Sequence, residues 1–150
     1  MSISIVVDKG DLQNVLGAIA RFVDFRKRFM NELPRHVLGW VRQSIRTRLI
    51  DDDYGPDNEP WPGWAPSYAG VNKLLFASGK MANSIKAVFR SGHGQLYTNV
   101  VYAAIHHYGG MTGRNHATKI PARPWFGIGK KDEPAIEHLI QAWLDKNGPE

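Results

Sequence analysis

Large apolar residues recur at every fourth position between residues 33 and 49, and this stripe constrains the fold more than any other feature. Its members are Leu33, Val37, Val41, Ile45 and Leu49. Because such spacing places side chains on one face of a helix, the pattern predicts a helix from Pro34 to about Ile50, with the proline in its first turn. Arg35, Arg42 and Arg46 fall on another face. The stripe therefore predicts a core helix that also carries a basic face.

Helical spacing also marks a segment on each side of this helix. Apolar residues recur from Leu12 to Val23 behind Asp11, a residue suited to cap a helix N-terminus. They recur again from Ile136 to Leu144, where Asp132 is the expected cap. We therefore expect two N-terminal helices and one C-terminal helix.

Alternating and β-branched residues predict strands in the rest of the chain. Ile3 to Val7 is typical of a short opening strand. The later segments are a strand at 85–90, a turn at 91–94, a partner strand at 95–101, an apolar and aromatic strand at 102–108, a loop at 111–118 and an extended, proline-containing segment at 119–128. The prediction is one α+β domain over residues 1–150. Its antiparallel sheet, a meander plus the N-terminal strand, packs against the two N-terminal helices and the C-terminal helix.

Composition excludes several classes of protein. The chain has no cysteine, which rules out disulfides, thiolate metal sites and cysteine nucleophiles. The first eight residues lack the basic flank and cleavage site of a signal peptide. No stretch approaches the roughly 18 apolar residues of a membrane span. We expect a soluble protein made in the cytoplasm.

Charge is distributed unevenly along the chain, whose formal net charge is +5. Acidic residues cluster at Asp51, Asp52, Asp53, Asp57 and Glu59, and none follows until Asp132. The basic residues of the interval are Lys73, Lys80, Lys86, Arg90, Arg114, Lys119, Arg123, Lys130 and Lys131. This segment is either a solvated surface paired with the acidic ends, or a positive surface for an acidic protein or a nucleic acid.

Histidines offer the most plausible metal ligands, but their setting argues against a metal site. His106 and His107 are adjacent, so on a strand they would point to opposite faces. His116 follows in a glycine-containing segment without a nearby carboxylate. The chain also lacks a Gly-x-Ser-x-Gly elbow and paired carboxylates. We predict no catalytic, cofactor-binding or metal-binding residues and no enzymatic activity, and a metal-dependent nuclease is the third hypothesis.

The rigid segment around Arg123 suggests a contact surface. Pro121 and Pro124 fix the direction of this arginine, and Trp125 offers a face on which it can stack. A surface arginine without a partner is the alternative. The interface candidates are Arg114, Lys119, Arg123, Trp125, Lys130 and Lys131.

Four motifs in a fixed order resemble those of a known family. They are the proline-rich segment Pro60-Trp61 to Ser67, Leu-x-x-Ser-Gly-x-x-x-x-Ser-Ile from Leu75, Tyr-Ala-x-Ile-His-x-x-Gly from Tyr102, and Ile-Pro-Ala-Arg-Pro from Ile120 with Trp125-Phe126-Gly127. Together they resemble the phage virion-morphogenesis, or tail-completion, family, and the resemblance covers most of the chain. It implies a small structural protein of the head–tail junction or tail end, without accepted catalytic residues.

The sequence thus predicts a non-enzymatic protein of tail completion or head–tail joining. We expect a homo-oligomeric ring at the neck of the virion, assembled in the host cytoplasm. The expected partners are other virion proteins: a tail terminator, the tail tube or a head–tail connector. We expect no membrane and no small-molecule substrate. The alternative function is nucleic-acid binding through the basic segment Lys73–Lys131.

Overall fold

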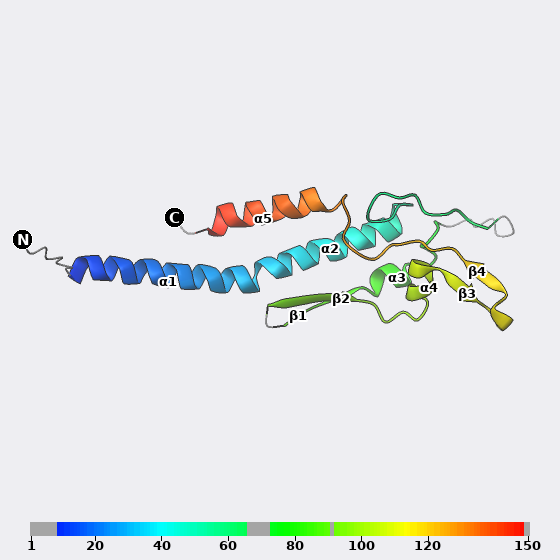
Figure 1. Ribbon diagram of the computed structural model, residues 1–150, viewed down its shortest axis with the longest axis horizontal. Coiled ribbons are helices and arrows are strands. Elements are labelled where there is room, and N and C mark those ends of the chain that lie inside the picture. Colours follow the sequence, from blue (N-terminus) through cyan, green and yellow to red (C-terminus); the bar gives the residue numbers. More distant parts are fainter. Residues whose placement is uncertain (1–8, 66–72, 91, 149–150) are drawn as a thin grey trace, which may run out of the picture.

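The computed structural model describes residues 9–65, 73–90 and 92–148, which form an elongated molecule (Figure 1). The predicted opening strand, Ile3 to Val7, lies outside the described residues, as does Ser91 of the predicted turn.

Two helices placed nearly end to end form the spine of the molecule (Figure 1). Helix α1 spans Lys9–Asn31 and α2 spans Leu33–Ile50. They are separated by one residue, Glu32, whose backbone N–H still donates to the Arg28 carbonyl at 2.8 Å. Pro34 occupies the first turn of α2, as predicted, where a helix needs no donor N–H. Helix α1 begins two residues before the predicted cap, Asp11.

The spine has different elements on its two sides. Helix α5, Glu133–Asn147, lies along one side of α2, and the first hairpin lies along the other (Figure 1). This hairpin pairs β1, Lys86–Arg90, with β2, His93–Tyr97. Arg90 pairs with His93, so the turn holds two residues and is shorter than the predicted turn at 91–94.

The far end of the molecule, opposite the N-terminus of α1, contains short helices and a second hairpin (Figure 1). Helix α3 spans Lys80–Asn83 and α4 spans Ala103–Tyr108. Strands β3, Gly110–Thr112, and β4, Thr118–Ile120, are joined through a short 3-10 helix, η1, at Arg114–His116. Two predictions were wrong here: the expected strand at 102–108 is instead helix α4 from Ala103 onward, and the expected loop at 111–118 contains most of β3 and all of η1.

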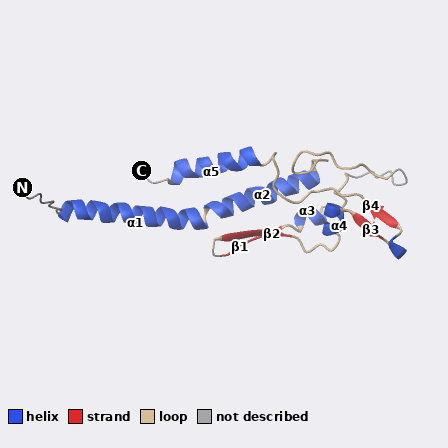
Figure 2. Cartoon of the chain, in the orientation of Figure 1, coloured by secondary structure: helices blue, strands red, loops and turns tan. Residues whose placement is uncertain are grey.

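The α+β class is confirmed. Among the described residues the strands form two separate two-stranded sheets, in place of one meander (Figure 2). Helix α4 separates them, since it occupies the chain between β2 and β3. Gly109 ends α4 with a φ of +72°, a conformation that costs glycine little and other residues more. The chain can therefore turn directly into β3.

The core is built on the predicted stripe of α2. Val41, Ile45 and Leu49 are buried together with Trp61 and Trp125 from loops and Ile85 beside β1. Leu33 and Trp143 are also buried, whereas Val37 is half-buried. Tyr102, in contrast, is 41% exposed, because it lies at the N-terminus of α4 beside a groove.

The apolar stripe of α1 is solvent-exposed in the single chain. Six of its side chains are each more than half exposed: Leu12, Val15, Leu16, Ile19, Phe22 and Val23. Helix α5 meets α1 nearer the C-terminal end of α1, where Trp143 packs against Phe25 and Phe29 at centroid distances of 6.1 and 6.0 Å. The first half of α1 extends beyond the C-terminal end of α5 (Figure 1).

None of the described helices combines the length and the apolar character that crossing a membrane requires.

Candidate functional site

The described parts of the four sequence motifs converge at the far end of the molecule. They surround a groove of about 340 Å³ between Trp64, the turn before α3, and α4. Its lining includes Trp64, Leu75, Phe76, Tyr102, His106 and Arg123. No carboxylate belongs to the described lining. A groove of this composition suits an apolar or aromatic side chain of a partner better than acid–base chemistry.

Arg123 fastens the proline-rich loop to the rest of this end. Its Nε donates to the carbonyl of Pro62 at 2.7 Å, and its Nη2 donates to that of Gly63 at 2.8 Å. The guanidinium also lies 5.9 Å from the centre of the Trp64 ring. Arg123 is only 4% exposed, so the rigid Pro-Ala-Arg-Pro segment directs this side chain into the protein.

Two tryptophans fix the segment on both sides of Pro124. The Trp61 indole N–H donates to the Pro124 carbonyl at 2.8 Å, and the Trp125 indole N–H donates to Ala103 at 3.3 Å. Gly109 lies under the same segment, and a side chain there would meet the Ala122 backbone nitrogen at 2.7 Å. The motif residues therefore hold one another in place.

The two adjacent histidines of α4 have different environments. His107 Nδ1 accepts the backbone N–H groups of Trp125 and Phe126, each at 3.2 Å. Burial lowers the pKa of His107, and Nδ1 can accept these bonds only when unprotonated. Burial and the nearby Arg123 charge lower the pKa of His106, whose buried Nδ1 has no hydrogen-bond partner in the described structure.

A buried ion pair joins this end to α2 and α5. Arg48 Nη2 lies 2.8 Å from Asp132 Oδ2, and the two side chains are 3% and 4% exposed. Arg48 also donates to the carbonyls of Trp125 and Gly127. Asp132 accepts from Ser44 Oγ at 2.6 Å and from the Gly129 N–H. Asp132 thus occupies the predicted cap position, but its side chain makes no cap bond and pairs with Arg48 instead.

Sequence reasoning missed Arg48, although one signal was present. Arg48 follows Ile45 by three residues and so falls on the apolar stripe of α2 rather than on its basic face. A charge in a core stripe indicates a buried partner, because an unpaired buried charge is very costly.

The predicted interface residues fall in three places. Arg114 and Lys119 lie exposed on the second hairpin. Arg123 and Trp125 lie inside, with their side chains in the intrachain contacts described above. Lys130 and Lys131 lie beside the acidic loop: the Lys130 N–H donates to Asp57, and Lys131 Nζ lies 3.2 Å from Asp52 Oδ2.

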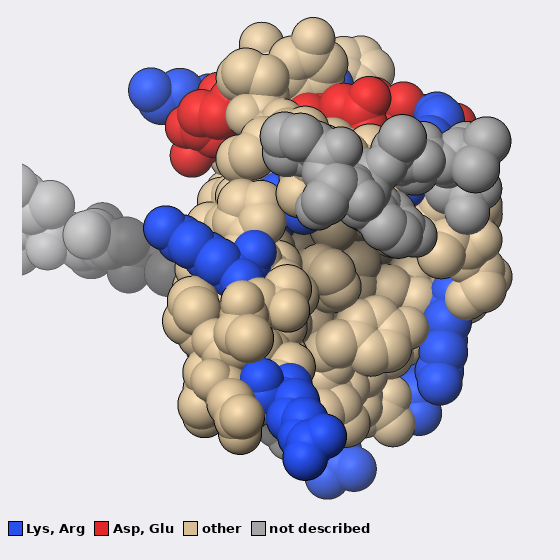
Figure 3. Space-filling view, turned by 90° about the vertical axis from the view of Figure 1, so that its right-hand side faces the viewer, with Lys and Arg blue, Asp and Glu red and all other residues tan. Residues whose placement is uncertain are grey.

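Charge at this end does not form one basic face. Figure 3 shows Lys and Arg side chains at separate places around it, with Asp and Glu gathered along one edge. Over the ranges that the structure describes, no three His, Cys, Asp or Glu side chains are grouped so that they could hold a metal ion.

Comparison with known proteins gives a consistent result. A family model described as the phage virion morphogenesis family matches residues 7–145. "Mu-like prophage FluMu G protein 2" of Haemophilus influenzae is 32% identical over 83 residues, which are 55% of this chain and 60% of that protein. "Putative capsid assembly protein G" of Escherichia phage Mu is 29% identical over 100 residues, 63% of this chain and 64% of that protein. Both matches span less than two thirds of the relative's length. No solved structure matches the chain significantly.

Replacing Asp132 with Asn should destabilise the protein by about 3–5 kcal/mol, because it leaves the Arg48 charge buried without its partner. Lys131→Met is the matched control, since its ion pair with Asp52 is exposed and worth about 1 kcal/mol or less. Urea unfolding of both variants measures the difference. Equal losses of stability would contradict the role of the buried pair.

Acidification should weaken the fold through the histidines of α4. The unfolded chain takes up a proton at each histidine near pH 6.5, whereas the folded state keeps His106 and His107 neutral to lower pH. Their stabilisation is therefore complete above about pH 6.5 and decreases as the pH falls towards the lowered folded pKa. Unfolding midpoints at several pH values measure this loss, which should be smaller in His107→Gln. If His107→Gln lost as much stability on acidification as the wild type does, His107 would not be a source of this loss.

Proposed function

Because this chain belongs to the phage virion morphogenesis family and so takes part in building the virion, we propose that it completes the tail or joins it to the head, as a ring of identical copies at the neck. The protein acts there as a structural part and not as a catalyst. Its partners are other virion proteins: a tail terminator, the tail tube or a head–tail connector.

The exposed stripe of α1 is the observation that carries this proposal. Monomeric soluble proteins rarely expose contiguous apolar patches larger than a few hundred Å². Here six large apolar side chains follow one face of a helix that extends beyond the rest of the chain. The segment from Leu12 to Ala20 also contains no charged residue. An assembly that covers this face explains why its side chains are apolar although the single chain leaves them exposed.

The motif-built end supports a structural role. Arg123, Trp61 and Trp125 make hydrogen bonds to backbone carbonyls of neighbouring segments. These bonds give a rigid end of defined shape, which suits docking into a symmetric assembly.

A protein partner fits the charges better than DNA does. Lys73 and Lys131 lie beside Asp51 and Asp52 of the same chain, at 3.9 and 3.2 Å. Arg114 and Lys119 lie on a different element from Lys130 and Lys131. A phosphate backbone is recognised by cations arranged along one track, whereas patches of mixed sign suit a partner protein.

Particles made without this protein should contain heads and tails that form but stay apart, as electron microscopy would show. Leu16→Glu with Ile19→Glu should fail to restore joined particles, because two charges enter the stripe. Gln13→Glu with Asn14→Glu is the matched control: it adds the same charge on the polar face of α1 and should restore them.

All four positions are exposed, so the unfolding temperatures of both variants should stay near that of the wild type. Overlong tails in the absence of the protein would place its action at termination instead of joining. Normal infectious particles without the protein, or with the stripe variant, would contradict the proposal.

Binding to duplex DNA should be weak and should hardly change in Lys130→Glu with Lys131→Glu. The measurement is a salt titration of DNA binding by both proteins. A DNA-binding protein would show a log–log slope of about −0.9 per phosphate neutralised. Submicromolar, salt-steep binding that the double variant loses would favour the nucleic-acid alternative.

A further inference from the structure

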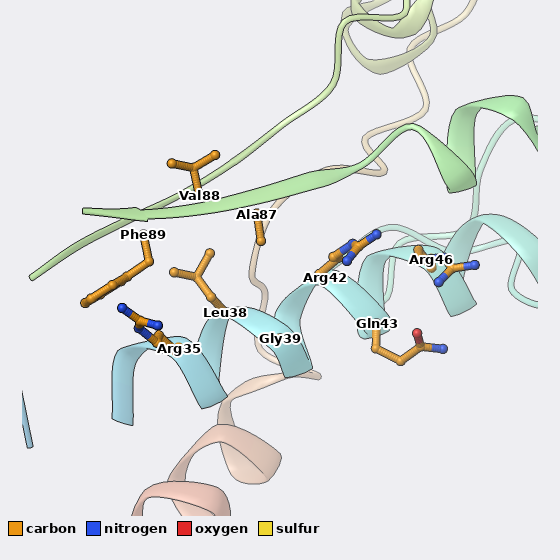
Figure 4. A pocket seen from close by; sticks show the side chains of 9 residues that line it. All are labelled: Arg35, Leu38, Gly39, Arg42, Gln43, Arg46, Ala87, Val88 and Phe89. Carbon is orange, nitrogen blue, oxygen red and sulfur yellow. The ribbon is translucent and has the colours of Figure 1, made fainter. Parts of the chain in front are cut away.

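A groove between α2 and β1 is distinct from the groove built by the motifs. It measures about 260 Å³. Its floor carries Arg35, Arg42 and Arg46 of α2, the basic face seen in the sequence. Ala87 and Phe89 point from β1 toward the helix and form an apolar wall, whereas Val88 points away (Figure 4).

The arginines of this groove lack an anionic partner. None of the three forms a salt bridge within the part of the chain that the structure describes. Arg35 stacks over the Phe89 ring at 4.9 Å, and Arg46 donates to Asn83 Oδ1 at 2.9 Å. The Nε atoms of Arg42 and Arg46 are shielded from solvent and have no described acceptor. Because a buried donor without an acceptor is costly, these two side chains favour a ligand that supplies hydrogen-bond acceptors.

A carboxylate matches this groove better than a phosphate backbone. Arg42 and Arg46 lie one helical turn apart, about 6 Å along the axis, within reach of one acidic turn. Guanidinium groups bind carboxylates with two parallel hydrogen bonds. The opposite wall is apolar, which suits a protein segment carrying both apolar and acidic side chains.

The same chain carries an acidic turn, residues 51–60, whose charge is opposite to that of the groove. Tyr54 and Pro60 form an isolated bridge, and the Gly55 N–H donates to the Glu59 carbonyl at 2.8 Å. Gly129 packs so closely on Pro56 that a side chain there would overlap its backbone. The turn is therefore held rigid, with little ordering left to occur on binding.

Two carboxylates of this turn are available to a partner. Asp53 and Glu59 are exposed and have no ion pair among the residues described. The other acidic residues of the turn already contact Lys73, Lys130 or Lys131. Asp53 and Glu59 are thus the two that would bind an arginine groove.

We propose that the arginine groove of one copy binds the acidic turn of the next copy. The turn follows the end of α2 on the side of α5, whereas the groove lies on the side of the first hairpin (Figure 1). The turn of a chain therefore does not face its own groove. A contact between two different surfaces joins copies head to tail and closes into a ring when the rotation permits. This proposal rests on the ring of the proposed function and names the surfaces that form it.

Charge exchange tests the pairing in phage that lack the gene for this protein and receive each variant from a separate source. Arg42→Glu with Arg46→Glu should reduce the yield of joined particles at least tenfold, since like charges then meet. Asp53→Lys with Glu59→Lys should do the same. The variant with all four substitutions should give a yield at least tenfold higher than either double variant, because opposite charges meet again. Lys27→Glu with Lys146→Glu makes the same charge change at exposed positions outside the groove and should leave the yield unchanged.

The outcomes separate this pairing from the proposed function. A full yield of joined particles with Asp53→Lys and Glu59→Lys would overturn the pairing, even if the groove variant is unstable. A variant with all four substitutions whose yield is no higher than that of either double variant would overturn it as well. Loss of DNA binding in the groove variant alone, with a fully active turn variant, would overturn it in favour of a phosphate ligand. The proposed function fails separately, if particles lacking the protein are normal.

Discussion

The buried pair of Arg48 and Asp132 is the interaction on which the rest of the structure depends. Arg48 comes from α2, Asp132 precedes α5, and their remaining bonds reach the carbonyls of Trp125 and Gly127. Helix α2 is thereby held to the segment from Trp125 to Asp132, which follows Arg48 by 77 to 84 residues. A buried ion pair is weak evidence of added stability, because desolvation opposes the attraction, but removing one partner is severe. The pair therefore fixes how α5 and the motif segment join the spine.

This arrangement leaves two kinds of surface with different roles. The motif end is rigid, since Trp61 and Arg123 fasten its loops through backbone carbonyls. The first half of α1, by contrast, extends from the body with its apolar stripe exposed. A rigid end and an uncovered helix are understandable in a member of the virion morphogenesis family, whose chains work inside a larger assembly. The arginine groove and the acidic turn add a charged pair of surfaces on different sides of α2.

Periodicity predicted what depends on local pattern. The core stripe of α2, the helical character of α1 and α5, the first hairpin and the α+β class are confirmed, and so is the family resemblance drawn from the motifs. The prediction of a strand at 102–108 was wrong, because five apolar or aromatic residues in a short run do not distinguish a strand from a helix. The partner of Asp132 lies 84 residues away, a separation that no local pattern reveals. The exposure of the α1 stripe was equally hidden, since an amphipathic helix has the same sequence whether its partner is the same chain or another.

Burial of α1 in the virion is the central claim, and cysteine labelling tests it most directly. The chain contains no cysteine, so Ile19→Cys places one thiol in the stripe and Gln13→Cys places one on the opposite, polar face. A maleimide should label both variants in the free protein. In purified particles the thiol at position 19 should be protected, while that at position 13 stays reactive. Equal labelling of position 19 in free protein and in particles would contradict the assembly role assigned to this helix.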